Sequence, residues 1–194
     1  MKKTTAVLFK IILIVLLIFI GIRTYKSAVI KLQKQLYPLP DKYIDTIEAY
    51  SKEYNIPIEL LCGIINTESS FTPSAYSNAG AIGIMQITED TFNWLQFKSG
   101  EQHETNELFD YKTNIKFGTM LLHYLYEEFQ DWDTTLAAYN AGRTRVHTWL
   151  EDLRYSKNGK LTNIPFEETA NYLKKVNKAA QKYKELYFSE ITTE

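Results

Sequence analysis

The chain contains the stretch Ile56-Pro-Ile-Glu-Leu-Leu-Cys-Gly-Ile-Ile-Asn-Thr-Glu-Ser-Ser-Phe71, then a run of small residues, then Gly83-Ile-Met-Gln-Ile87. Pro57 suits the first position of a helix, where its missing N–H costs nothing. Apolar residues then recur at helical spacing, at Leu60, Leu61, Ile64 and Ile65. Glu68 stands four residues after Ile64, so it continues the same stripe. The sequence therefore predicts a helix whose apolar face ends on a carboxyl group.

Glu68 is the candidate functional group of this stretch. Burial disfavours the charged form of a carboxyl group, so a Glu on an apolar face either costs stability or serves a function. Burial also raises the pKa of the group, and a general acid that works near neutral pH needs such a raised pKa. We therefore expect Glu68 to be partly shielded from water at the end of its helix.

Length and composition indicate one folded domain after an N-terminal extension. The chain has 194 residues, and the roughly 150 that follow residue 40 are the usual size of a domain with a single core. Apolar residues make up 45% of the chain and aromatic residues 14%, with only 8 Gly and 5 Pro, which excludes a disordered protein. The single Cys62 has no partner for an intrachain disulfide and suits a small buried hydrophobe.

The net charge of −1 hides an asymmetry along the chain. Residues 1–40 hold seven of the 22 Lys and Arg and no Asp or Glu, so the remaining 15 bases face all 23 acids, a net charge of −8. Phosphate binding needs a basic surface, so this acidic domain is not expected to bind nucleic acid.

The N-terminal segment has the composition of a membrane anchor. Residues 1–5 form a short basic head, and residues 6–22 are apolar apart from Lys10, which lies toward one end and can snorkel to the headgroups. The alternative is a cleaved signal peptide and a secreted protein, but residues 23–28 offer no good small-x-small cleavage site. We favour an uncleaved single-pass anchor in the cell membrane, followed by a stalk over residues 23–40.

The charges beside this span do not orient it. Two Lys precede the span and four bases follow it closely, so the positive-inside rule gives no support for a C-terminal domain outside the cell. The function that the motifs below imply is what places the domain on the wall-facing side.

Helical signals recur through residues 41–188, the expected domain. Asp41 and Thr88 suit N-caps, Gly142 suits a helix end, and Pro165 suits a helix start. The predicted helices are 41–54, 57–68, 88–97, 110–129, 133–141, 143–153 and 165–187. Residues 72–81 and 155–160 are expected to be loops, and residues 98–109 are left without an assignment. No segment shows convincing strand alternation, so the predicted fold class is all-α, with a C-terminal tail over 189–194.

Four segments stand out in this order along the chain: Glu68-Ser69, Gly80-Ala-Ile-Gly-Ile-Met-Gln86, Ala138-Tyr-Asn-Ala-Gly142, and Pro165-Phe-Glu-Glu-Thr169 with Asn171-Tyr172. Together they resemble the four motifs of the soluble lytic transglycosylase catalytic domain, a relative of goose-type lysozyme. The resemblance covers about residues 41 to 185. It implies a goose-type, lysozyme-like helical fold, here in a membrane-anchored form.

The resemblance also implies a reaction and a substrate. Lytic transglycosylases cut the β-1,4 bond between N-acetylmuramic acid and N-acetylglucosamine in peptidoglycan glycan strands and leave a 1,6-anhydro ring on the muramic acid. By similarity Glu68 is the single general acid and base. The N-acetyl group of the substrate can stabilise the reacting centre, so a second carboxylate is not required.

Seven further residues take supporting roles by resemblance. Ser69, Gly83, Met85 and Gln86 would line the sugar cleft, Tyr139 would bring its hydroxyl within hydrogen-bond reach of Glu68, Asn140 would bond nearby backbone or substrate, and Glu168 would lie across the cleft. Four of them have a structural alternative. Ser69 could satisfy a carbonyl at a helix end, Met85 and Tyr139 could be core residues, and Glu168 could complement a helix dipole.

Some features depart from the family or leave alternatives open. Ala170 stands where the family commonly has Arg, which puts any contact made by that Arg in doubt. A hydrolytic muramidase on the same fold and a non-catalytic peptidoglycan-binding or assembly protein are the alternative functions. The three His residues show no metal-ligand spacing and no Gly-rich phosphate loop is present, so we expect neither a metal nor a cofactor.

Overall fold

A computed structural model describes residues 2–189 of the chain. The chain divides into two compact units, Met1–Pro38 and Leu39–Glu194, which are described separately. Met1 of the expected basic head lies outside the described residues, as does the expected tail apart from Ser189.

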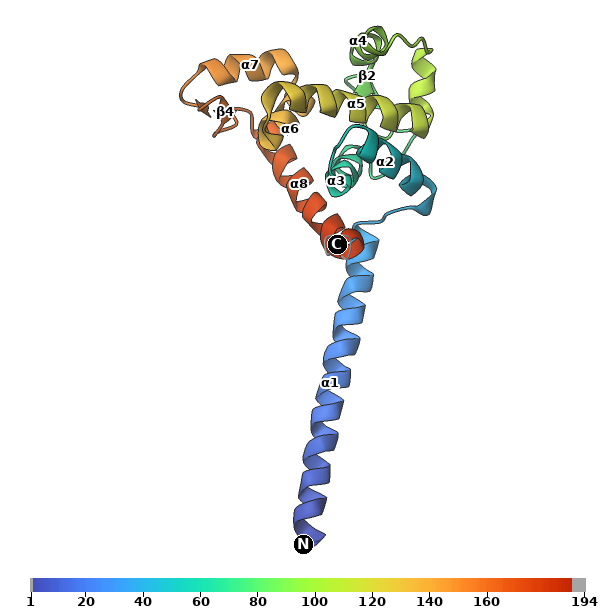
Figure 1. Cartoon of the computed structure of the whole chain (residues 1–194), viewed down its shortest axis with the longest axis vertical. Helices are drawn as coiled ribbons and strands as arrows, with labels where there is room; N and C mark the ends of the chain where they lie inside the picture. The colour runs from blue at the N-terminus through green and yellow to red at the C-terminus, as the bar shows by residue number, and fades with distance from the viewer. Residues whose placement is uncertain (1, 190–194) are drawn as a thin grey trace. The chain divides into compact units, whose positions relative to one another are not determined.

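The first unit is one helix, α1 (Lys2–Leu36) (Figure 1). From Leu8 to Leu36 it is long and apolar enough to cross a membrane, and its large apolar side chains are exposed. The helix continues without a break past residue 22, as expected for a helical stalk, and ends just before Pro38.

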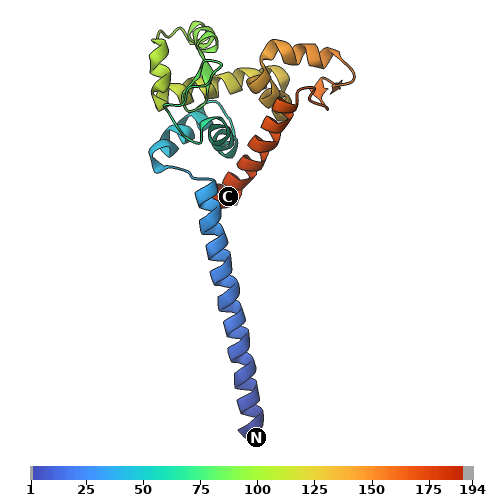
Figure 2. The ribbon, with the colours of Figure 1, turned by 180° about the vertical axis from the view of Figure 1, so that it is seen from behind.

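The second unit is helical, which confirms the predicted fold class. Its helices are α2 (Asp41–Glu53), α3 (Ile58–Ser69), α4 (Glu89–Ser99), α5 (Tyr111–Phe129), α6 (Trp132–Ala141), α7 (Arg143–Glu151) and α8 (Glu167–Tyr183), with a 3-10 turn at Thr105–Phe109 and a π turn at Lys184–Phe188. Helix α5 runs across this unit, with α4 on one side and α2 and α3 on the other (Figures 1 and 2). Helix α7 lies beyond α6, at the end of the unit away from α4.

Two short hairpins correct the expectation that the domain contains no strands. β1 (Ala81–Ile82) pairs with β2 (Ile87–Thr88), and β3 (Ser156–Lys157) pairs with β4 (Lys160–Leu161), both antiparallel. Residues 155–160 are therefore a hairpin and not a plain loop. Its turn, Asn158-Gly159, has φ values of 54° and 74°, the left-handed geometry that favours this dipeptide. Strands of two residues are too short to show the alternation by which strands are recognised.

The helix boundaries follow the predicted caps with three corrections. Thr88 and Asp110 cap α4 and α5 by accepting a backbone N–H, and Gly142 ends α6. Asp41 is the first residue of α2 and not its cap, and Asp131, upstream of the predicted start, caps α6. Pro165 precedes α8, which begins at Glu167.

Helix α3 is at the centre of the core and packs along α8. Leu61, Ile64 and Ile65 are fully buried, as the apolar stripe predicted. Cys62 is buried as well, and burial raises the pKa of its thiol. Gly63 is where the two helices come closest, because a Cβ there would lie 2.8 Å from the Ala180 backbone nitrogen.

Candidate active site

Glu68 lies in the last turn of α3, one residue before its end, and its side chain is partly buried. This confirms the expected position and shielding. Burial raises the pKa of the Glu68 carboxyl from 4.5 to about 7, while the Tyr172 hydroxyl acts in the opposite direction. The effect of burial is the larger of the two, so Glu68 is half protonated near neutral pH.

Tyr172, on α8, faces Glu68. Its hydroxyl is buried and has no hydrogen-bond partner of ordinary geometry within residues 2–189. It nevertheless interacts with the Glu68 carboxyl. Burial, and then the charge of Glu68, raise the pKa of Tyr172 far above its usual value. Tyr172 belongs to one of the four motifs but received no role from the sequence, since periodicity places it on a buried helix face like any core aromatic.

Tyr139, near the end of α6, also lies close to Glu68, since burial and then the charge of Glu68 raise its pKa. Its hydroxyl donates to the Met85 carbonyl oxygen at 2.7 Å, and no bond joins Tyr139 to Glu68 among the described residues. A phenol has one hydrogen to donate, and the Met85 carbonyl receives it. That the Tyr139 hydroxyl lies within hydrogen-bond reach of Glu68, as its acceptor, stays a prediction.

The turn between β1 and β2 is anchored to α5 by Asn114. The Asn114 Oδ1 atom accepts the Met85 N–H at 2.8 Å, and its Nδ2 atom donates to the Ile82 and Leu108 carbonyls, both at 2.8 Å. Gly83 has a φ of 81°, and a Cβ there would collide with the Asn114 side chain and the Leu108 carbonyl. Gly83 thus shapes this turn through its missing side chain.

Asn114 was not among the predicted site residues. It is fully buried on α5. The sequence offered one signal for its role, namely a polar residue at a core position of a predicted helix. The sequence did not show which groups it bonds, because its partners come from the β1–β2 hairpin and the 3-10 turn.

The side chain of Met85 is fully buried and faces Gly118 of α5. A Cβ at Gly118 would lie 2.5 Å from the Met85 sulfur, so the thioether fills the space that this glycine leaves. The expectation that Met85 contacts a sugar is wrong for this structure. Its side chain belongs to the core, and its backbone carbonyl accepts a hydrogen bond from the Tyr139 hydroxyl.

The Ser69 hydroxyl is already used within the protein. It donates to the Ile84 carbonyl at 2.7 Å and accepts the Thr72 N–H at 3.1 Å, which ties the end of α3 to the β1–β2 turn. Gln86 has a φ of 53°, and its Nε2 donates to the Gly83 carbonyl at 2.9 Å. Both residues therefore hold the backbone beside Glu68 in place.

The two remaining predicted residues lie at the surface. Asn140 is exposed and makes no side-chain hydrogen bond to another described residue. Glu168 is exposed in the first turn of α8, the position where acids complement a helix dipole. The structure therefore brings together Glu68, Ser69, Gly83, Gln86 and Tyr139, and leaves Asn140 and Glu168 outside this group.

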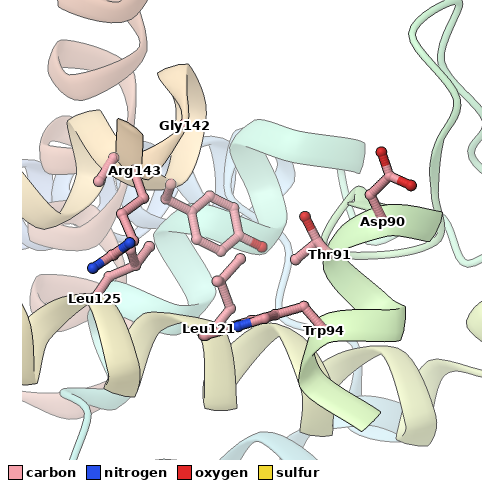
Figure 3. A pocket seen from close by; sticks show the side chains of 9 residues that line it. Asp90, Thr91, Trp94, Leu121, Leu125, Gly142 and Arg143 are labelled. Carbon is pink, nitrogen blue, oxygen red and sulfur yellow. The ribbon is translucent and has the colours of Figure 1, made fainter. Parts of the chain in front are cut away.

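A pocket of about 330 Å³ opens beside Tyr139. Its walls come from α4, α5 and the junction of α6 and α7, and they are lined by Asp90, Thr91, Trp94, Leu121, Leu125, Ala138, Tyr139, Gly142 and Arg143. Thr91 and Trp94 of α4 lie across from Leu121 of α5 (Figure 3). Tyr139 thus both lines this cavity and lies close to the Glu68 carboxyl.

Fold and site together define an all-α, lysozyme-like domain with one shielded carboxyl at its centre. Residues 45–162 match the model of the transglycosylase SLT domain, and the chain belongs to this family. The chain is 35% identical over 142 residues to the soluble lytic murein transglycosylase of Escherichia coli K12, covering 71% of this chain and 22% of that protein.

Two further similarities agree with this assignment. The membrane-bound lytic murein transglycosylase C of Glaesserella parasuis is 31% identical over 167 residues, covering 74% of this chain and 46% of that protein. The structure of an inactive Glu-to-Gln mutant of lytic transglycosylase Slt from Pseudomonas aeruginosa superposes with a TM-score of 0.69 at 28% identity, covering 78% of this chain and 25% of that one. The chain thus spans between about a fifth and a half of these relatives.

Proposed function

We propose that the protein is a membrane-anchored lytic transglycosylase that cleaves the β-1,4 bond between N-acetylmuramic acid and N-acetylglucosamine in peptidoglycan. The observation that carries the proposal is Glu68, a partly buried carboxyl group whose pKa is raised to about 7. Relatives named as lytic murein transglycosylases support the substrate class.

The first step uses the protonated form of Glu68. Its proton passes to the glycosidic oxygen as the bond from the muramic C1 to that oxygen breaks, and the bonding electrons remain on the oxygen. The N-acetyl group of the substrate stabilises the positive charge that develops at C1. A general acid is most effective when its pKa lies near the working pH, which the Glu68 environment provides.

The second step uses the carboxylate that remains. Glu68 takes the proton of the muramic C6 hydroxyl while the C6 oxygen attacks C1, which closes the 1,6-anhydro ring and restores the protonated acid. The Tyr172 hydroxyl favours the charged form of Glu68, so in this proposal it stabilises this intermediate state of the acid. Within residues 2–189 no second carboxylate shifts the pKa of Glu68, in keeping with a single-acid reaction.

The supporting residues divide into two groups in this proposal. Ser69 and Gly83 hold the backbone that surrounds Glu68, as their contacts suggest. Gln86, Asn140 and Glu168 contact the sugars. Asn140 and Glu168 are exposed, which leaves their side chains available to a glycan strand.

The test compares Glu68→Gln with the parent protein on purified peptidoglycan. Removing a general acid is expected to lower the rate of release of soluble fragments by about 10²- to 10⁴-fold. Glu59→Gln, a matched change in the first turn of the same helix, is expected to keep the parent rate. Mass spectrometry of the fragments is expected to show the anhydro products.

Other outcomes would overturn the proposal. Products that carry an added water would identify the hydrolytic muramidase. A parent protein that binds glycan without cutting it would identify a binding or assembly protein. Equal activity of Glu68→Gln and the parent would remove Glu68 from the mechanism.

We also propose that residues 6–22 anchor the protein in the cell membrane, that residues 23–40 form a stalk, and that residues 41–188 act on the wall-facing side. The apolar helix α1 supports the anchor. The orientation rests on the substrate, which lies outside the membrane. The alternative is a protein secreted after cleavage of the N-terminal segment.

A further inference from the structure

The geometry points to Arg143 as a specificity-determining residue that binds a carboxylate of the substrate in the pocket beside Tyr139. This inference rests on the proposed function, because it assigns a ligand group to a cavity next to the proposed acid. It adds a charged contact to a reaction that otherwise involves only neutral parts of the sugars.

Arg143 is held in place by one bond and keeps the rest of its donors free. Its Nε donates to Glu128 Oε2 at 2.6 Å, and His147 Nε2 contacts Glu128 Oε1 at 2.5 Å. Both oxygens of Glu128 are therefore occupied, and the Nη1 and Nη2 groups of Arg143 have no partner among the described residues. These two groups form one edge of the guanidinium, which suits a bidentate carboxylate contact.

The walls of the pocket are partly apolar. Leu121 and Leu125 of α5 and Trp94 of α4 line it beside Arg143, whose side chain is 57% exposed and therefore open to a ligand. The Trp94 ring is 39% exposed and offers a flat face to a sugar or an acyl group. The Arg143 side chain extends past Leu125, on the side of the cavity away from α4 (Figure 3).

The pocket has opposite charges at its two ends. Asp90 of α4 lies at the far end from Arg143, with Thr91 and Leu121 between them (Figure 3). A ligand that fits this arrangement presents a carboxylate to Arg143 and hydroxyl or amide N–H groups to Asp90. An uncharged glycan would leave the Arg143 end unmatched.

Tyr139 connects this pocket to the proposed acid. Its ring lines the cavity, its hydroxyl bonds the Met85 carbonyl, and its pKa responds to Glu68. A group bound at Arg143 is therefore attached to a sugar near the reacting bond. Muramic acid carries a lactyl group whose carboxyl is either free or joined to a peptide that bears carboxylates of its own. Either source presents the same chemistry to Arg143.

The binding test uses the full chain with Glu68→Gln in detergent, so that no turnover is needed. Three ligands are titrated by calorimetry: a glycan fragment with peptide stems, the same fragment after amidase treatment has left the lactyl carboxylate free, and an N-acetylglucosamine oligomer of equal length. Adding Arg143→Gln is expected to weaken binding about 10- to 100-fold for a carboxylate-bearing ligand, the usual range for a charge-assisted contact, and to leave the neutral oligomer unchanged.

The pattern of loss identifies the source of the carboxylate. Loss only for the peptide-bearing fragment assigns a peptide carboxylate, and loss only for the stripped fragment assigns the lactyl carboxylate. Equal effects on all three ligands, or no effect on any, would overturn the inference. Arg154→Gln, a change at another exposed Arg paired with an acid, is expected to bind all three ligands as the parent does.

A kinetic measurement separates this inference from the proposed function. In the otherwise unchanged full chain, Arg143→Gln is expected to raise KM for the preferred substrate with little change in kcat, since the contact is remote from the proton transfer. If the protein makes no anhydro products, the proposed function fails, while a carboxylate-selective loss of binding would still support the role of Arg143.

Discussion

At the scale of the residue, the protein keeps a carboxyl group in an environment that opposes its charge. Glu68 ends the apolar stripe of α3, and burial outweighs the favourable interaction with Tyr172. In the proposed mechanism, a pKa near 7 would let the same group donate a proton in one step and accept one in the next. The environment that supports the chemistry therefore has a cost in stability.

That cost predicts a pH-dependent gain in stability for Glu68→Gln. The pKa is about 7 in the folded protein against 4.5 in the unfolded chain, so the folded state binds the proton more tightly and loses stability as pH rises from 4.5 through 7. We expect the substitution to raise the free energy of unfolding by about 2 kcal/mol at pH 8 and by little at pH 5. Urea unfolding of the detergent-solubilised chain at both values measures this. A gain of equal size at pH 5 and pH 8 would contradict it.

Tyr172→Phe is expected to shift the pH dependence of glycan cleavage. The Tyr172 hydroxyl lowers the pKa of Glu68, so its removal raises that pKa further. Cleavage needs protonated Glu68 first, so the decline in rate at alkaline pH should move to higher pH. The rate at the optimum should fall, because the carboxylate loses a stabilising neighbour. Initial rates between pH 5 and pH 9 measure both effects.

Tyr54→Phe provides the control for that profile, since Tyr54 does not influence Glu68. A shift of the alkaline limb of Tyr172→Phe to lower pH, or an unchanged profile, would show that Tyr172 does not act on the acid.

At the scale of the elements, the site depends on how closely α3 and α8 approach. Gly63 allows the contact: a Cβ there would lie 2.8 Å from the Ala180 nitrogen and 3.0 Å from the Val176 oxygen. Five residues further along α3 stands Glu68, and Tyr172 stands four residues before Val176 on α8. The packing of the two helices therefore also sets the distance between these two side chains.

Gly63→Ala is expected to destabilise the domain. Helix propensity alone would favour Ala by about 1 kcal/mol, but overpacking costs about 1–3 kcal/mol, and here the contacted atoms are backbone that cannot turn aside. We expect a net loss of about 1–2 kcal/mol in the free energy of unfolding, together with reduced cleavage activity. Gly21→Ala in α1 is the matched control, because nothing lies within 4 Å of that position. An unchanged unfolding midpoint for Gly63→Ala would show that the helices separate without cost.

At the scale of the whole molecule, the chain combines a basic, apolar helix with an acidic folded unit. All the side chains assigned to the site lie within Leu39–Glu194. The proposed cleavage of the glycan therefore does not require α1, and we propose that the apolar surface of α1 attaches the protein to the membrane. Such attachment would keep the domain close to the membrane.

Deleting residues 1–38 is expected to release the protein from the membrane without lowering its rate on soluble glycan fragments. Carbonate washing of membranes, followed by detection in pellet and supernatant, measures the release for both chains. Protease added to intact protoplasts should digest the full-length domain if it faces the wall. Two results would contradict the anchor and indicate a cleaved signal peptide. One is recovery of the full-length chain in the carbonate supernatant, and the other is a mature N-terminus beyond residue 22.

The all-α class, most helix positions and the central acid were predictable because their signals are local. Periodic apolar residues, the N-cap at Thr88 and the glycine that ends α6 act on neighbours within one or two turns. Glu68 stood out for the same reason, since its place on the stripe is a matter of spacing. The hairpins were not predicted because a strand of two residues is too short to show an alternation of apolar and polar residues.

The partners of the site side chains could not be read in the same way. Tyr139 bonds a carbonyl 54 residues away and Asn114 holds an N–H 29 residues away, and no local pattern selects among distant groups of the same chemistry. In the folded protein the Met85 side chain packs in the core and the Tyr172 hydroxyl faces Glu68. Short-range preferences thus specified the elements and the acid, while the environment that sets the Glu68 pKa arose from helices brought together over long distances in the chain.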